Sequence, residues 1–333
     1  MTDRKIHLSL SVIGIIVEAM AFLSGLLTDW RTRFSVLAVI WGFSFLLIKL
    51  GTEAFAPLQI SLLRILSGAA VLLAALLMRR DRLPRGARTW LHLAVAAVFL
   101  NVLPFTLFGY AELRISSTLA GICNATTPLW GMLVAMVALR EDRPTRARFG
   151  GLLLGFIGVL TVLNAWQGFV GHDLLGTALA LIASASYAVG WAYVRRTLAN
   201  NPGSHLSLST GQLLIGAAQL VVITPMFTTM PTTFPAGPLI AVLALGVVGT
   251  GVAFLLQYRL VAEVGPTTGQ MVTYFIPIIA TIAGVTLLGE ELIWTTPVGA
   301  VIVLAGALLT QTRHRVSVEA PPSRAEPATA ETR

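Results

Sequence analysis

The sequence is poor in charged residues and has almost no cysteine. Only 11% of its 333 residues are charged, against 56% that are hydrophobic, whereas a soluble domain carries about 25% charged residues. So few polar groups could not cover the surface of a soluble domain, and the composition favours a helical protein that crosses a membrane many times. The single cysteine, Cys123, excludes an internal disulfide and a cysteine-based metal site. Because it lies in an apolar run, we expect a small buried hydrophobe there.

The sequence also lacks the signals of a nucleotide-driven or nucleic-acid-binding protein. It contains no G-x-x-x-x-G-K-[ST] loop, so ATP hydrolysis by this chain has no support. The net charge of +8 would suggest a nucleic-acid partner in a soluble protein. Here the arginines lie in short segments between apolar runs, and we interpret them as orientation signals in a lipid bilayer, with no nucleic acid as partner.

Long apolar runs recur regularly along the chain. About ten have the length that a helix needs to span a bilayer, at residues 34–50, 57–78, 89–110, 116–139, 148–165, 174–195, 206–227, 236–258, 266–288 and 295–312. The expected fold class is therefore an all-α integral membrane protein. Two segments flank this bundle. Residues 1–30 are a hydrophobic extension with Glu18 inside it, read as an extra span, an interfacial helix or a spurious start ahead of Met20; we expect a helix outside the bundle. Residues 316–333 are rich in Pro, Ala and Glu and are predicted to be a disordered tail.

Arginine placement predicts the orientation of the spans. If ten spans alternate, most arginines fall on one side, and Arg114 is the main exception. Short cytoplasmic loops are enriched in Lys and Arg. We therefore expect a multi-pass protein of the inner or plasma membrane with both ends of the bundle, and the C-terminus, in the cytoplasm.

The chain contains an internal repeat. Residues 116–142 superimpose on residues 265–291 at an offset of about 149 residues, the kind of self-similarity that marks a duplicated unit. The matched pairs are Pro128 with Pro277, Glu141 with Glu290, Thr118 with Thr267, Trp41 with Tyr187, Arg64 with Gln212, and Tyr110 with Tyr258. Each half contains five of the ten runs. Because five is odd, the second half must enter the membrane from the opposite side. Such an inverted repeat predicts a binding site near the midplane, between the halves.

The order of these motifs resembles that of a known family. The resemblance rests on W-G-x-S-F at 41–45, Arg64, Pro128, the E-D-R-P…G-G-x-x-x-G-x-x-G run at 141–158, Pro277, Gly289-Glu290-Glu291, and Gly299 with Gly306. In both halves they are similar to EamA domains of the drug/metabolite transporter superfamily. The resemblance implies a first EamA repeat at 34–165 and a second at 174–312, folded as ten helices around a central cavity. It also implies export of amino acids, other metabolites or toxic compounds.

Polar groups within the spans are the candidates for a substrate pathway. Arg64 lies roughly 10 Å into its span, where it could anchor an anionic substrate group or serve as a structural partner for helix-end carbonyls or Glu112. The other candidates, each of which could equally serve packing, interface anchoring or helix–helix hydrogen bonds, are Trp41, Asn101, Tyr110, Asn124, Tyr187, Trp191, Gln212, Gln257, Tyr258, Gln270, Thr273 and Tyr274.

The paired prolines and glutamates are candidates for moving parts. Pro128 and Pro277 each free a carbonyl at a matching depth, which predicts bends that either serve packing or flex as access alternates. Glu141 and Glu290 are expected at helix ends on opposite faces, either solvated or as gates that take turns. Every Asp and Glu between residues 34 and 312 is expected in a loop or near a helix end. This predicts exchange or facilitated movement, or proton coupling through Glu112 alone.

The leading functional hypothesis is a secondary transporter for a small molecule, working by alternating access without cofactor or metal. A channel or structural membrane subunit is the first alternative, and a homodimer is left open. An intramembrane enzyme that uses Ser44 is the second alternative. It is disfavoured because no histidine lies at a matching depth.

Overall fold

The computed structural model describes residues 29–138, 146–167, 173–229 and 231–310, and every regular element in these ranges is a helix. Within them, eight helical segments are long and apolar enough to span a membrane, and two apolar helices, Phe149–Val162 and Thr295–Leu309, are shorter. Together they correspond to the ten predicted runs, so the all-helical membrane fold is confirmed. The predicted N-terminal extension and C-terminal tail lie outside the described residues.

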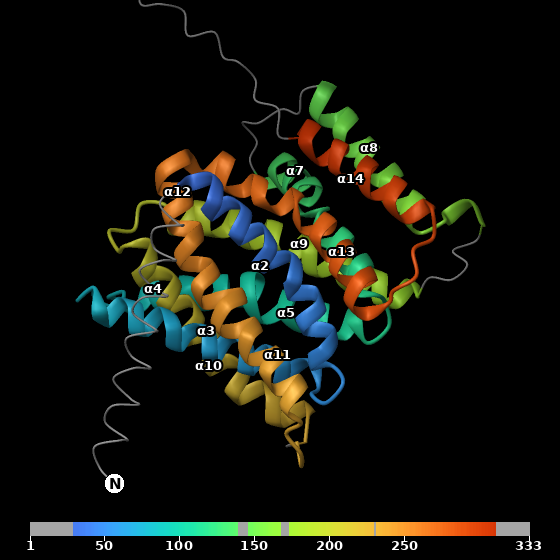
Figure 1. Ribbon diagram of the computed structural model, residues 1–333. Coiled ribbons are helices and arrows are strands. Elements are labelled where there is room, and N and C mark those ends of the chain that lie inside the picture. Colours follow the sequence, from blue (N-terminus) through green and yellow to red (C-terminus); the bar gives the residue numbers. More distant parts are fainter. Residues whose placement is uncertain (1–28, 139–145, 168–172, 230, 311–333) are drawn as a thin grey trace, which may run out of the picture.

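Each half of the chain builds a similar series of helices (Figure 1). In the first half these are α2 (Trp30–Gly51), α3 (Pro57–Met78), α4 (Ala87–Ala97), η1 (Val98–Val102), α5 (Leu103–Glu112), α6 (Ser117–Asn124), α7 (Thr127–Ala138), α8 (Arg146–Val162) and the short η2 (Ala165–Gln167). In the second half they are α9 (Leu174–Thr197), α10 (His205–Phe227), α11 (Ala236–Gly246), η3 (Val247–Val252), α12 (Ala253–Gln270), η4 (Met271–Tyr274), α13 (Ile276–Leu288) and α14 (Thr295–Thr310).

The third span of each half carries the same irregularity. In the first half, η1 is a π-helical segment between α4 and α5. In the second half, η3 is a π-helical segment between α11 and α12. π-Helical turns are rare and occur frequently at functional sites. Their matching positions are independent support for the internal repeat, and they draw attention to this level of the bundle.

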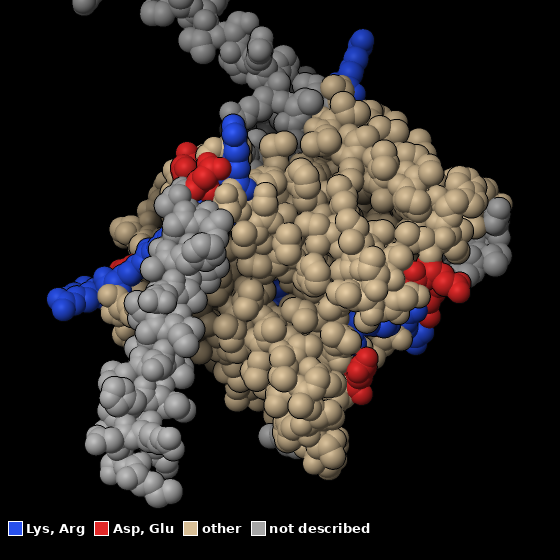
Figure 2. Space-filling view, viewed as in Figure 1, with Lys and Arg blue, Asp and Glu red and all other residues tan. Residues whose placement is uncertain are grey.

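The helices have two opposite ends, which are named here by one residue each. The Glu290 end contains the C-termini of α2, α5 and α13 and the N-termini of α6 and α9. The Arg33 end contains the N-termini of α2 and α10 and the C-termini of α3 and α12. Figure 2 shows most of the charged side chains near the top and left edges and at the right and lower right of the visible face, with a broad, mainly uncharged area between them in which a small blue patch is visible. This distribution is the one that a bilayer requires.

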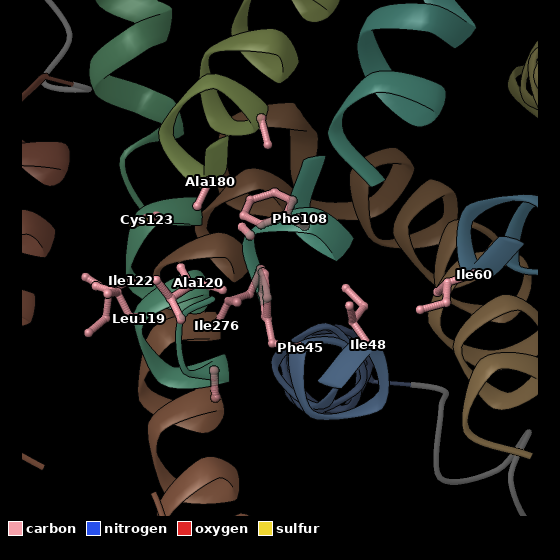
Figure 3. Close-up of a cluster of buried hydrophobic side chains, with 14 of the residues drawn as sticks. Phe45, Ile48, Ile60, Phe108, Leu119, Ala120, Ile122, Cys123, Ala180 and Ile276 are labelled. Carbon is pink, nitrogen blue, oxygen red and sulfur yellow. The ribbon is translucent and has the colours of Figure 1, made fainter. Parts of the chain in front are cut away.

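The largest apolar core lies where the two halves meet. It joins Phe45 of α2 and Phe108 of α5 to residues of α6, α9 and α13, among them Cys123 and Ile276 (Figure 3). The rings of Phe45 and Phe108 meet edge to face, with centroids 5.3 Å apart. Cys123 is only 3% exposed there, as predicted for a small buried hydrophobe. This core fixes α6 against α13 and thereby positions the contacts at the Glu290 end.

One boundary differs from the prediction. The sequence predicted separate runs at 236–258 and 266–288, but α12 continues without a break through the intervening residues to Gln270. The reason lies in its packing: Leu260 is fully buried, and with Val264 it extends the apolar contact with α2. The following span, Met271–Leu288, therefore begins later than predicted.

The prolines expected to bend helices instead stand at the start of new ones. In the first half α6 ends at Asn124 and α7 begins at Thr127, with Pro128 second. In the second half Pro277 lies in the first turn of α13, after the 3₁₀ segment η4. A proline fits the first turn of a helix because its missing N–H would have no partner there. Each proline thus separates two helical segments within one span.

The fifth span of each half pairs with its counterpart. Helices α8 and α14 lie side by side at one edge of the bundle (Figure 1). Their backbones meet at glycines: a Cβ added to Gly306 would lie 2.6 Å from the Cα of Gly155 and 2.6 Å from the carbonyl oxygen of Gly151. No real side chain tolerates such distances, so only glycine permits this approach, as is common between membrane helices.

We predict that Gly306→Ala separates α8 from α14 and lowers the stability of the bundle by about 1–3 kcal/mol, the usual effect of overpacking. The measurement is thermal unfolding of the purified protein in detergent. Gly150→Ala on α8 is the matched control, because a Cβ there meets nothing within 4 Å. Both changes improve helix propensity equally, so equal melting temperatures for the two variants would contradict the packing argument.

Candidate functional site

Arg64 of α3 lies buried between the halves. It is 7% exposed, and its Nε donates a hydrogen bond of 3.0 Å to Oγ1 of Thr250, in the π-helical segment η3 of the other half. Gly68, one turn further along α3, allows this approach, since a Cβ there would lie 2.9 Å from the Thr250 methyl group. The first half thus places a cation against the irregular helix of the second.

The repeat-related residue makes the equivalent contact in the opposite direction. Gln212 of α10, which aligns with Arg64, donates from Nε2 to Oδ1 of Asn101 at 2.6 Å. Asn101 is fully buried in η1, the π-helical segment of the first half. Each half therefore bonds the π-helical segment of the other through the second span. The Gln212–Asn101 bond joins two neutral amides, whereas the donor of the Arg64–Thr250 bond is a charged guanidinium.

The Arg64 side chain has an aromatic support and unused hydrogen-bond donors. Its guanidinium carbon lies 3.7 Å from the ring centroid of Phe105, a contact that contributes about 2 kcal/mol when desolvated. Tyr187 and Glu112 are ionisable groups close enough to act on it. Among the described residues, no carboxylate bonds the guanidinium, and its terminal nitrogens have no acceptor. A buried cation that forms no ion pair is costly.

Glu290, in the second half, contacts the first half of the chain. Its carboxylate accepts hydrogen bonds from the backbone N–H of Ser117 at 2.7 Å, from the N–H of Thr118 at 3.0 Å and from the Thr118 hydroxyl at 2.6 Å. These donors form the first turn of α6, where a negative charge also interacts favourably with the helix dipole. Gly284 leaves the room for it, since a Cβ there would collide with the carboxylate.

A second charge at the same end satisfies helix carbonyls. The Lys49 ammonium, near the C-terminus of α2, donates to the backbone oxygens of Glu112 at 2.5 Å and Ile115 at 3.1 Å. These oxygens lie at the end of α5, where carbonyls lack helical partners and a cation is favourable. The side chain of Glu112 itself is completely buried, and both carboxylate oxygens lack a hydrogen-bond partner among the described residues.

Two further contacts between charged residues lie near the two ends. At the Glu290 end, Asp173 accepts from the N–H of Gly176 at 2.7 Å and from Arg114 at 3.0 Å. The N–H bond first, and then the arginine, lower the pKa of Asp173 below its usual value. At the Arg33 end, Arg33 of the first half forms an ion pair with Glu263 of the second. The two halves are thus joined by polar contacts at both ends.

The proline breaks are satisfied by hydroxyl groups. The carbonyl of Asn124, which Pro128 was predicted to free, accepts from the Thr127 hydroxyl at 2.7 Å. The carbonyl of Cys123 accepts from the hydroxyls of Thr126 at 2.6 Å and of Ser184, on α9, at 2.8 Å. No costly unpaired carbonyl therefore remains at these two positions, and the break is joined to the second half through Ser184.

The other predicted pathway residues are distributed over the bundle. Trp41 and Tyr187 are half-buried and pack on the core between the halves. Tyr258 bonds Ser209 and stacks on His205, while Tyr274 donates to the carbonyl of Ala307. Asn124 and Gln257 are 9% and 7% exposed, and Thr273 is half-buried in η4. Tyr110 and Trp191 are 36% and 47% exposed on the surface and do not join Arg64. The side chain of Gln270, and the whole of Glu141, lie outside the described residues.

Sequence reasoning missed several members of the site. Phe105, Thr250, Ser117 and the cap formed by Lys49 were not selected, because nothing in the sequence marks their contacts with the other half. One signal was available: Arg64 and Gln212 align in the repeat, and an inverted repeat places aligned residues symmetrically about the interface. The alignment could therefore have directed attention to the third span of the opposite half.

Comparison with known proteins agrees with this architecture. A model of the EamA-like transporter family matches residues 34–164 and 174–312. The chain is 28% identical over 267 residues to YedA, an uncharacterized inner membrane transporter of Escherichia coli K12, covering 77% of this chain and 82% of YedA. It is 27% identical over 289 residues to YvbV, an uncharacterized transporter of Bacillus subtilis, covering 84% and 90%.

A further relative has a named solute. Over 274 residues the chain is 27% identical to an S-adenosylmethionine/S-adenosylhomocysteine transporter of Chlamydia trachomatis serovar L2, covering 76% of this chain and 80% of the relative. A solved crystal structure aligns with a TM-score of 0.60 over 84% of this chain and 95% of that chain, at 21% identity, and shares the fold. Both matches of the family model fall on the two inverted halves, so the chain belongs to the EamA-like transporter family and is a multi-pass membrane transporter, not an enzyme.

Proposed function

We propose that the protein exports a small organic solute that carries a carboxylate, such as an amino acid or an amino-acid derivative, by alternating access. The observation that carries this proposal is Arg64: a buried guanidinium at the interface of the halves, held by Thr250 and Phe105, with its terminal nitrogens unbonded among the described residues. A guanidinium matches a carboxylate with two parallel hydrogen bonds, which gives both affinity and orientation.

The named relative supports the same class of solute. Its two solutes are amino-acid derivatives, and each has a carboxylate that a buried arginine could receive. A drug-like compound with an acidic group would meet the same chemical requirement. We therefore assign the class of solute from Arg64 and use S-adenosylmethionine, with a panel of amino acids, as the first probes.

The contacts at the two ends support alternating access. Glu290 of the second half bonds the first turn of α6 in the first half, and Arg33 of the first half pairs with Glu263 of the second. Each contact joins the halves at one end only, so breaking one and keeping the other would open the interface toward one side of the membrane. Glu141 stays a candidate for the role of Glu290 at the opposite end.

The distribution of basic residues supports an orientation. At the Glu290 end, the basic residues of the described chain are Lys49, which binds carbonyls, and Arg114, which pairs with Asp173. The exposed arginines lie at the Arg33 end, at positions 31, 79, 80, 82, 85, 88, 146, 195, 196 and 259. Because cytoplasmic loops carry the excess of positive charge, we assign the Arg33 end and the C-terminus to the cytoplasm, and the Glu290 end to the outside.

The first test is counterflow in proteoliposomes. We expect saturable counterflow of a carboxylate-bearing probe, lost in Arg64→Gln and partly kept in Arg64→Lys. The loss of hydrogen bonds to a charged group should weaken apparent affinity about 10- to 100-fold. Arg88→Gln, at an exposed position, is the control and should behave as the parent. Unchanged affinity in Arg64→Gln would exclude the anchoring role, and flux without counterflow would indicate a channel.

The second test concerns the contact of Glu290 with α6. In a Cys123→Ala background, we introduce Ser117→Cys beneath this contact and measure its reaction with a membrane-impermeant maleimide. Glu290→Gln should raise the labelling about five- to thirtyfold, because loss of a charge at a helix N-terminus costs about 1–2 kcal/mol. Gly284→Ala should also raise it, because the added Cβ would collide with the Glu290 carboxylate. The exposed neighbour variant Glu291→Gln should leave labelling unchanged; equal labelling in all variants would refute a gate at this position.

The third test concerns orientation. A reporter that is active only in the cytoplasm should give a signal when inserted in the 79–88 loop or after Arg315, and none when inserted near Gly168. The positive charge of the Arg33 end is the physical reason for this expectation. A silent reporter at both of the first two sites, with an active one near Gly168, would reverse the assignment of the two ends.

A further inference from the structure

Glu112 is a buried acidic residue that the transport proposal does not use. It is the last residue of α5 and is 0% exposed. Both of its carboxylate oxygens lack a hydrogen-bond partner among the described residues. Its backbone oxygen, in contrast, accepts from Lys49 at 2.5 Å. The side chain is thus enclosed by protein directly behind the contacts that join the halves at the Glu290 end.

The charged groups around Glu112 come from several elements. Those close enough to act on its carboxylate are Lys49 of α2, Arg64 of α3 and Glu290, which follows α13. The titratable groups of the remaining neighbours are Tyr187 and the N-cap residue Asp173 on α9, where Asp173 is paired with Arg114, and Cys123 on α6. Lys49 is held by two carbonyls. No donor among the described residues therefore bonds the Glu112 carboxylate.

The two protonation forms of Glu112 suit different arrangements of this end. A carboxylate enclosed without a hydrogen-bond donor carries a large desolvation cost, whereas the neutral acid does not. When the end is closed, as in this structure, Lys49 and Arg64 favour the carboxylate while the nearby Glu290 disfavours it, and burial without a hydrogen-bond donor is the largest effect. When the end opens, water can solvate the Glu112 carboxylate.

We propose that Glu112 is a proton-binding site whose protonation accompanies closure of the Glu290 end. The carboxylate takes one proton from water at that end as the end closes, and the neutral acid stays enclosed behind Lys49 and Glu290. The consequence for transport rests on the proposed function: if solute leaves at the Glu290 end, the empty carrier binds this proton before that end closes and releases it to water when that end opens again. The site itself requires no assumption about the solute.

A direct test uses dicyclohexylcarbodiimide, a hydrophobic reagent that reacts with protonated carboxyl groups in apolar surroundings. The full-length protein in proteoliposomes is treated across a range from mildly acidic to alkaline pH, and the modified residues are identified by mass spectrometry. We expect modification of Glu112 that decreases as the pH rises. The exposed Glu291 serves as the control carboxyl and should not be modified. Absence of modification at Glu112 at every pH would overturn the proposal.

The link to the gate is tested with the Ser117→Cys reporter in the Cys123→Ala background. Because maleimide reacts with the thiolate, labelling is expressed relative to that of the same variant unfolded in denaturant at the same pH. On this scale, raising the pH should increase labelling in the parent, because the carboxylate form favours the open end. In Glu112→Gln, which stays neutral, labelling should be low at every pH. In Glu112→Asp, which can still titrate, the dependence of labelling on pH should persist. This variant shows that low labelling in Glu112→Gln does not result from misfolding. The same dependence on pH in Glu112→Gln as in the parent would overturn the proposal.

These readouts are independent of the solute. If counterflow fails with every probe but labelling follows the protonation of Glu112, the proton site stands and the assignment of the solute is wrong. If counterflow depends on Arg64 but Glu112→Gln labels as the parent does, the transport proposal stands and the proton site is wrong.

Discussion

A polar group inside a bilayer must find its partner within the protein, and in this molecule the partners lie in the other half of the chain. Arg64 reaches Thr250, Gln212 reaches Asn101, and Glu290 reaches the first turn of α6. The same atoms that satisfy buried polar groups therefore also hold the two halves together. A movement between the halves must exchange these bonds for others, which links the energetics of the fold to the transport cycle.

Much of the architecture could be predicted from the sequence, because the signals are strong and local. Runs of apolar residues specify spans, and the offset that brings Pro128 onto Pro277 specifies two related halves. The odd number of spans per half then fixes their inversion. Arg64 could be selected because a cation within an apolar span always needs an explanation. These inferences need only composition, periodicity and the geometry of a bilayer.

The contacts of the site could not be predicted in the same way, because they join residues far apart in the sequence. Glu290 reads as a solvated helix end until α6 is seen beneath it, and Glu112 reads as a loop residue until its burial is known. Pro128 was expected to leave the carbonyl of Asn124 free, but the Thr127 hydroxyl donates a hydrogen bond to it. The α12 helix passes the expected break because its apolar contact with α2 outweighs the local signals for a turn.

The two hydrogen bonds between the second spans and the π-helical segments are related by the repeat but differ chemically. Gln212 and Asn101 are both amides and bond each other, whereas Arg64 bonds one hydroxyl and keeps donors for an anion. A symmetric carrier would present two equivalent anchoring positions. Here one of the two repeat-related positions holds a cation and the other a neutral amide, so of this pair of described residues one carries a charge. The two halves are thus equivalent in backbone at this interface but not in charge.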